Sequence, residues 1–112
     1  MKNKEKHLKR LEVLKNVNDN WDGENAKKAN EETLKSALLF IEKSHLSDYS
    51  IYITYEGNVE FAFFEKPIPE DLTIEVSNNT YKVLLDEKEY PNVNLQELCD
   101  FLNTYKEENI ML

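Results

Sequence analysis

The residues best suited to chemistry stand at positions 18–23, where the chain reads Asn-Asp-Asn-Trp-Asp-Gly. Oxygen-bearing side chains at alternate positions followed by glycine match the first half of a calcium-binding loop. Such a loop needs a glutamate at its twelfth position, which here is Ala29. We therefore predict no metal site. We interpret Trp21, Asp22 and Gly23 as a structural turn that ends the first helix, because Asn, Asp and Gly favour turns.

Other residues that catalyse reactions or bind metals are sparse. His7 and His45 have no cysteine or second histidine at ligand spacing, which argues against zinc. The single cysteine, Cys99, has leucines at helical spacing around it and is predicted to be a buried structural thiol. The chain has no Gly-x-Ser-x-Gly, no phosphate-binding glycine loop and no Cys-x-x-Cys. We therefore predict a protein that is not an enzyme and uses no cofactor.

The charge distribution separates a basic N-terminus from an acidic remainder. The net charge is −8, yet residues 1–15 hold six basic residues against two acidic ones. The rest of the chain holds eight lysines against twenty acidic residues. An acidic body repels phosphate backbones and attracts cationic partners, so a basic protein partner is expected and direct nucleic-acid binding is not. Without a bilayer-spanning apolar run or paired cysteines, we predict a cytoplasmic protein with no membrane contact.

Three helices are predicted to carry these residues. Leucines three residues apart indicate a helix over residues 3–17. A second helix over residues 31–45 has Asn30 as its N-cap. The third begins after Asn94, where Glu97 completes a capping box. The predicted apolar face of the second helix consists of Leu34, Ala37, Leu38 and Ile41.

The clearest β-hairpin turns at Asn78-Asn79, since asparagine tolerates the positive φ of a two-residue turn. This turn places Val76 opposite Tyr81 on an apolar face. It also places Glu75 opposite Lys82, a favourable cross-strand pair on the other face. A shift by one residue would mix the two faces, so the register is well defined.

An earlier hairpin turns at residues 56–58. We predict a three-residue loop that pairs Ile53 with Phe61 and Tyr55 with Val59, because this register keeps the apolar side chains on one face. Together the two hairpins give a four-stranded antiparallel sheet. The predicted order is α-α-β-β-β-β-α in one domain over residues 1–112, which is the α+β class.

The sheet face away from the helices is predicted to be open. It combines aromatic and apolar side chains with carboxylates, which is typical of an interaction surface. The predicted partner-binding residues are Tyr52, Glu60, Phe64, Glu75 and Leu84.

The sequence resembles a group of small, largely uncharacterised bacterial and phage proteins. These share an N-W-D-G-x-x-A element, here residues 20–26, and a G-x-[VI]-x-[LF]-x-W strand, here residues 57–63. The similarity covers about residues 8–85, and Phe63 stands where tryptophan is usual. The resemblance implies a bacterial or phage source and a shared fold. It implies no activity, so it assigns no functional residue.

These observations predict a non-enzymatic acidic module of the inhibitor, antitoxin or immunity type that binds a basic protein. In a sharper version of this hypothesis, the acidic surface mimics a nucleic-acid backbone and occupies a nucleic-acid-binding protein. Two alternatives remain open. One is a small enzyme or ligand-binding domain with a pocket near Trp21 and Asp22. The other is a structural homodimer built on the open sheet face or on a free sheet edge.

Overall fold

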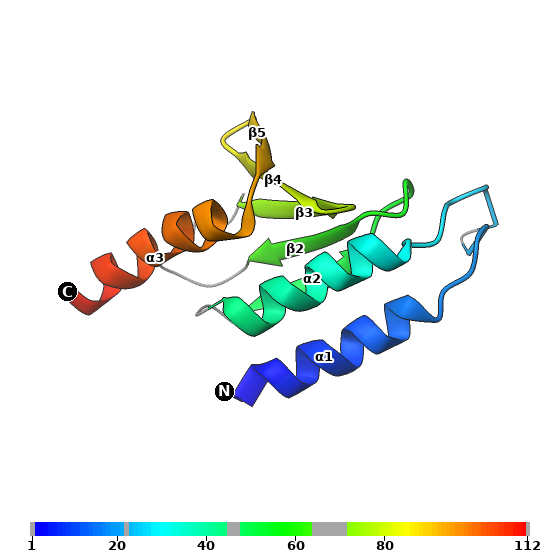
Figure 1. Cartoon of the computed structure of the whole chain (residues 1–112), viewed down its shortest axis with the longest axis horizontal. Helices are drawn as coiled ribbons and strands as arrows, with labels where there is room; N and C mark the ends of the chain where they lie inside the picture. Colours follow the sequence, from blue (N-terminus) through cyan, green and yellow to red (C-terminus); the bar gives the residue numbers. More distant parts are fainter. Residues whose placement is uncertain (1, 22, 45–47, 64–71, 112) are drawn as a thin grey trace.

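Three helices cover one face of a five-stranded antiparallel sheet (Figure 1). The computed structural model describes residues 2–21, 23–44, 48–63 and 72–111, with side chains from residue 4 to 104 within these ranges. The helices are α1 (Lys2–Lys15), α2 (Glu31–Lys43) and α3 (Leu95–Met111). The strands are β1 (Tyr49–Ile53), β2 (Val59–Phe63), β3 (Thr73–Ser77), β4 (Thr80–Leu85) and β5 (Lys88–Val93). The predicted α+β class is confirmed, whereas the prediction of four strands is wrong.

The strands lie in the order β1-β2-β3-β4-β5, so each strand pairs with its neighbours in the chain and β1 and β5 form the two edges. Helix α1 packs against β1, α2 packs over β2 and β3, and α3 contacts β4. No helix in the described part of the chain is long and apolar enough to cross a membrane. The arrangement covers the inner face of the sheet with helices and leaves its outer face without them.

The core lies between α2 and the inner face of the sheet. Phe40 of α2 is fully buried, with its ring centroid 4.6 Å from that of Phe61 and 5.9 Å from that of Tyr49. Ile74 and Val76 of β3 are also fully buried, while Thr73, Glu75 and Ser77, which alternate with them along the strand, are not. This alternation follows from the two-residue period of a β-strand.

The side of α2 that faces the sheet is rotated from the predicted one. Ala37 and Ile41 are buried as predicted, but Leu34 is only half-buried and Leu38 is 36% exposed. Phe40, which we did not place on the buried face, lies at its centre. Leu38 therefore points away from the sheet, toward the surface of the helical layer.

Two hydrogen bonds on the buried side of α2 stabilise this orientation. The Thr33 hydroxyl accepts a hydrogen bond from the Asn78 backbone N–H at 2.8 Å. The Tyr81 hydroxyl donates to the Ser36 backbone carbonyl at 2.7 Å. These bonds tie α2 to the β3–β4 turn and to β4, and so favour the observed side of the helix as the buried one.

The helix caps are as predicted. The Asn30 side chain accepts from the backbone N–H three residues later at 2.8 Å. The Asn94 side chain accepts from the Glu97 N–H at 2.8 Å, and the Glu97 carboxylate accepts from the Asn94 N–H at 3.1 Å, which confirms the capping box. Helix α1 ends two residues before the predicted end. Helix α2 ends at Lys43 with Ser44 as its C-cap, two residues before the predicted end at His45, which itself lies outside the described residues.

The Asn78-Asn79 hairpin is confirmed, with Val76 opposite Tyr81 and Glu75 opposite Lys82. Asn78 has a φ of 53°, in the left-handed region that this turn requires.

The predicted register of the first hairpin is wrong by two residues. Ile53 pairs with Val59, so the connection has five residues rather than three. Thr54 and Asn58 close this longer loop. The Thr54 N–H donates to the Asn58 carbonyl at 2.8 Å, and the Thr54 hydroxyl accepts from the Asn58 N–H at 3.0 Å. A shift of two residues keeps every side chain on its predicted face.

Strand β5 is absent from the prediction because its sequence lacks strand signals. Its first five residues, Lys-Glu-Tyr-Pro-Asn, do not alternate between apolar and polar side chains, and all five are exposed in the structure. Pro91 and Asn92 lie opposite the single residue Lys82, forming a β-bulge, which is one of the few places in a sheet that accepts proline. The β4–β5 turn uses Asp86 and Glu87 at φ 53° and 65°, without the usual glycine.

Candidate functional site

The outer face of the sheet carries a row of polar residues that crosses four strands. Tyr52 of β1 is opposite Glu60 of β2, Glu60 is opposite Glu75 of β3, and Glu75 is opposite Lys82 of β4. We call these four residues the charged row. They alternate along their strands with buried side chains such as Phe61, so they point away from the helices.

A second row runs beside the charged row on the same face. It consists of Ser50, Ala62, Thr73, Leu84 and Glu89. The structure therefore brings together four of the five predicted partner-binding residues, Tyr52, Glu60, Glu75 and Leu84. The fifth, Phe64, lies outside the described residues. The corrected hairpin register places Tyr52 opposite Glu60 instead of Ala62, so the aromatic residue lies in the same row as the carboxylates.

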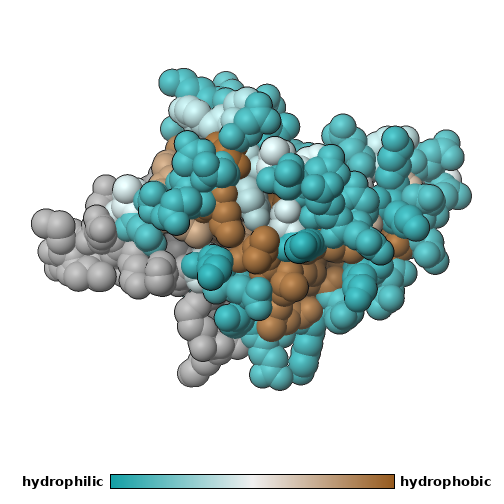
Figure 2. Space-filling view, viewed as in Figure 1, coloured by the Kyte–Doolittle hydropathy of each residue, from teal (hydrophilic) through white to brown (hydrophobic). Residues whose placement is uncertain are grey.

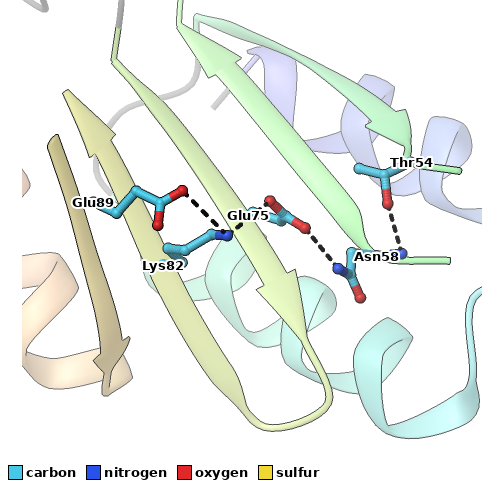
Figure 3. A network of polar contacts seen from close by, with 5 residues as sticks. All are labelled: Thr54, Asn58, Glu75, Lys82 and Glu89. Carbon is cyan, nitrogen blue, oxygen red and sulfur yellow. Dashed lines mark hydrogen bonds and ion pairs between the residues drawn. The ribbon is translucent and has the colours of Figure 1, made fainter. Parts of the chain in front are cut away.

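A chain of polar contacts fixes half of this face (Figure 3). The Lys82 ammonium lies 3.6 Å from the Glu75 carboxylate and 3.8 Å from that of Glu89. The Asn58 side-chain amide donates to the other Glu75 oxygen at 2.6 Å, and Asn58 is itself held by Thr54. The Glu75 side chain is only 14% exposed, and its bonds to Lys82 and Asn58 hold it in one orientation. Glu89 belongs to the strand that the sequence did not reveal.

Glu60 is the unbalanced charge of the outer face. Among the described residues, no hydrogen bond or ion pair joins its carboxylate. Its nearest charged neighbour across the strands is Glu75, which has the same sign. Burial, and secondly the charge of Glu75, raise the pKa of Glu60 above its ordinary range. Like charges directly opposite on adjacent strands destabilise a sheet, so this site holds unfavourable electrostatic energy in the free protein.

Removing the charge of Glu60 is therefore expected to stabilise the protein. We predict that Glu60→Gln raises the free energy of unfolding by about 0.5 kcal/mol at neutral pH, the size of one cross-strand pair. A raised folded-state pKa makes the ionised group unfavourable above that pKa. The gain should therefore shrink as the pH falls through the folded pKa, and vanish below the ordinary glutamate pKa.

Urea unfolding at neutral and at acidic pH measures this difference. The control is Glu42→Gln, which removes an exposed carboxylate on α2. A Glu60→Gln protein that is less stable than the wild type at neutral pH would contradict this electrostatic interpretation.

A hollow of about 240 Å³ adjoins the polar contacts on the outer face. It is lined by Glu56, Asn58, Glu75, Ser77, Thr80, Lys82, Pro91 and Asn92. Its lining holds no cysteine or histidine, and within the described ranges no three metal-ligating side chains lie close enough to hold an ion. The chemistry available there is hydrogen bonding and ion pairing.

The loop that carries Trp21 is held together by internal hydrogen bonds. The Trp21 indole N–H donates to the Lys27 carbonyl at 2.9 Å, and the ring is 41% exposed. Gly23 has a φ of 78°, in the region that favours glycine. Asp22 lies outside the described residues. The Asn20 side-chain oxygen accepts from the Asn25 N–H at 2.7 Å, so this oxygen of the calcium-like pattern serves the backbone.

This loop docks on the turn between β1 and β2. The Lys27 N–H donates to the Tyr55 carbonyl at 2.9 Å, and the Tyr55 hydroxyl donates to the Glu24 carbonyl at 3.1 Å. A Cβ atom at Gly57 would lie 2.5 Å from the Lys28 carbonyl oxygen, so only glycine permits this approach. The segment that follows Trp21 and the turn between β1 and β2 therefore pack against each other. A hollow beside this loop is lined by Asp19, Asn20, Asn25, Ala26 and Lys27. If the protein is instead a small enzyme or ligand-binding domain, this hollow is the candidate for its pocket.

The remaining candidates for chemistry serve packing. His7 is buried, with its ring stacked on Tyr49 at a centroid distance of 4.1 Å. Cys99 is half-buried rather than buried, and burial raises the pKa of its thiol, which disfavours the reactive thiolate.

Comparisons of this chain with protein-family models, with curated proteins and with solved structures found no match. The function must therefore be inferred from the residues themselves. Among them, the outer face of the sheet combines exposed aromatic surface, unbalanced carboxylates and a rigid support.

Proposed function

We propose that the protein is a non-enzymatic binding module whose outer sheet face binds a basic protein. The observation that carries this proposal is the Glu60–Glu75 pair, two carboxylates directly opposite each other. In the part of the chain that the structure describes, only Glu75 has a cationic neighbour. A lysine or arginine of a partner placed beside Glu60 would neutralise the pair and remove its repulsion. The free energy that this pair costs the free protein then favours the complex.

The composition of the face supports a protein rather than a small ion as the ligand. Tyr52 stands at one end of the charged row and is 46% exposed. Leu84 and Ala62 contribute partly exposed apolar surface in the second row. An aromatic anchor with carboxylates around it can hold the apolar stem of a lysine or arginine as well as its charge.

The type of partner follows from the charge of the whole chain. An acidic body steers basic proteins toward it and away from phosphate backbones. This suits an inhibitor, antitoxin or immunity protein of bacterial or phage origin that acts in the cytoplasm. If the basic partner binds nucleic acid, carboxylates such as Glu60, Glu75 and Glu89 occupy the places of phosphates.

Affinity capture of the tagged protein from the lysate of its host tests this proposal. We expect a basic protein that stays bound at low salt and is released at high salt, because complementary charge is screened by ions. Capture of an acidic or neutral protein that resists high salt would count against a binding face of carboxylates.

A further inference from the structure

A groove on the helical layer lies between α1 and α2. It has a volume of about 500 Å³ and is lined by Leu8, Leu11, Glu12, Lys15, Glu31, Leu34, Lys35 and Leu38. Figure 2 shows apolar residues as a brown patch among hydrophilic residues on the face of the molecule that carries these helices. The groove belongs to the opposite side of the molecule from the charged row.

The two helices line the groove with residues at equal spacing. They run antiparallel, so the end of α1 at Lys15 and the start of α2 at Glu31 lie at the same end of the layer (Figure 1). Counting from this end, α1 contributes Lys15, Glu12, Leu11 and Leu8, and α2 contributes Glu31, Leu34, Lys35 and Leu38. Both series have steps of three, one and three residues. Each rises about 10 Å along its helix, at 1.5 Å a residue.

The charges of the groove alternate in sign around its rim. On α1, Lys15 lies nearest the end from which the positions are counted and Glu12 comes next. On α2, Glu31 lies nearest that end and Lys35 is the next charged residue. All four side chains are exposed. The far end of the groove is apolar on both sides, with Leu8 facing Leu38.

This pattern is complementary to itself. If a second groove is laid on the first by a two-fold rotation about an axis parallel to the helices, α1 of one copy covers α2 of the other at the same level. Glu12 then meets Lys35 and Lys15 meets Glu31, each twice, since a two-fold contact repeats every pair. Leu8 meets Leu38 at the apolar end. A two-fold axis in the plane of the contact but perpendicular to the helices would instead place each helix on its own copy in reverse, so that leucines would face charged residues.

We propose that this groove is the interface for a second copy of the same chain, in a dimer with that two-fold axis. The two helical layers then form a four-helix bundle, with leucines inside and ion pairs at the rim. An apolar centre with a polar rim is the usual composition of a protein interface. Both outer sheet faces stay accessible, so the dimer presents two charged rows to partners. The inference does not depend on the proposed function of the outer face.

Charge exchange between the helices tests this dimer. One variant carries Glu12→Lys with Lys15→Glu, and the other carries Glu31→Lys with Lys35→Glu. In either variant alone, all four rim pairs join like charges, so we expect the dissociation constant to rise at least about tenfold. A mixture of the two variants restores every pair, and we expect it to form a heterodimer as tightly as the wild type dimerises.

Light scattering coupled to size exclusion over a dilution series, with native mass spectrometry of the mixture, measures these species. The wild type should show twice the 13.2 kDa mass of one chain. The control is Glu5→Lys with Lys9→Glu, which exchanges an exposed pair of α1 outside the groove lining and should leave the dimer intact. Thermal unfolding followed by circular dichroism verifies that each variant is folded. A monomeric wild type, or a dimer that survives both exchanges, would overturn the proposal.

Discussion

Reversing both carboxylates of the charged row, by Glu60→Lys with Glu75→Lys, is expected to weaken binding of the captured partner by about 2–5 kcal/mol. Since 1.4 kcal/mol is about a tenfold change in affinity, the complex should be lost at ordinary concentrations. The physical reason is that the attraction between the Glu60–Glu75 pair and a cation of the partner becomes repulsion, at a place where the Glu75 side chain is largely shielded from water. Calorimetric titration of the partner into each variant measures the loss.

Two further variants separate charge from structure in this experiment. Glu5→Lys with Glu42→Lys makes the same change in net charge on the helical layer, where both residues are exposed. It should weaken binding slightly, through long-range charge alone. Glu60→Gln with Glu75→Gln keeps the size of the side chains and should give an intermediate affinity. Equal affinities for the reversed variant and the helical-layer variant would move the binding site away from the outer face.

The largest effect on stability is expected for Phe40→Ala, which should lower the free energy of unfolding by about 3–5 kcal/mol. The Phe40 ring is fully buried, within 4.6 Å of Phe61 and 6.4 Å of Tyr81 between centroids. Its removal leaves a cavity between α2 and the sheet that rigid strands cannot fill. Because domains of this size have only about 5–15 kcal/mol in total, the variant should be close to unfolding at body temperature.

Leu39→Ala is the matched control for this prediction. Leu39 lies in the same turn of α2, next to Phe40, but is 38% exposed, so truncating its side chain should cost less than about 1 kcal/mol. Denaturant unfolding of both variants gives the comparison. Equal losses for the two variants would show that the core is not centred on Phe40.

Local signals in the sequence were sufficient for several elements. The caps at Asn30 and Asn94 and the Asn78-Asn79 hairpin each depend on residues within four positions of one another. The hydrogen bonds that define them join near neighbours, so a short stretch of sequence is enough to predict them. These features appear in the structure as predicted.

Contacts between distant segments explain what the sequence did not reveal. On the buried side of α2, Thr33 bonds to Asn78 in the β3–β4 turn and the Ser36 carbonyl bonds to Tyr81 of β4, each partner 45 positions away. The Arg10 guanidinium donates to the Ile51 carbonyl at 3.0 Å and ties α1 to the edge strand, a contact between segments 41 positions apart that no local pattern indicates. Strand β5 has five exposed residues followed by one half-buried residue, so its side chains show no two-residue period that a sequence pattern could reveal.

The candidate site was predicted in part for the same reason. Strand alternation alone placed Tyr52, Glu60 and Glu75 on one face, and that placement survives the two-residue error in register. The contributions of Asn58 and Glu89 depended on a loop length and on a strand that no local signal gave. A close approach such as that of Gly57 to Lys28 likewise becomes visible only in the fold.

The most direct test of the proposed function is a map of the partner on this protein. Amide chemical shifts of the isotope-labelled chain would be recorded with and without the captured partner. Binding at the outer face predicts that the largest changes fall in β1–β4 around Tyr52, Glu60 and Glu75, while the groove between α1 and α2 changes little. Changes concentrated in the groove or in the Trp21 loop, with the charged row unaffected, would contradict the account.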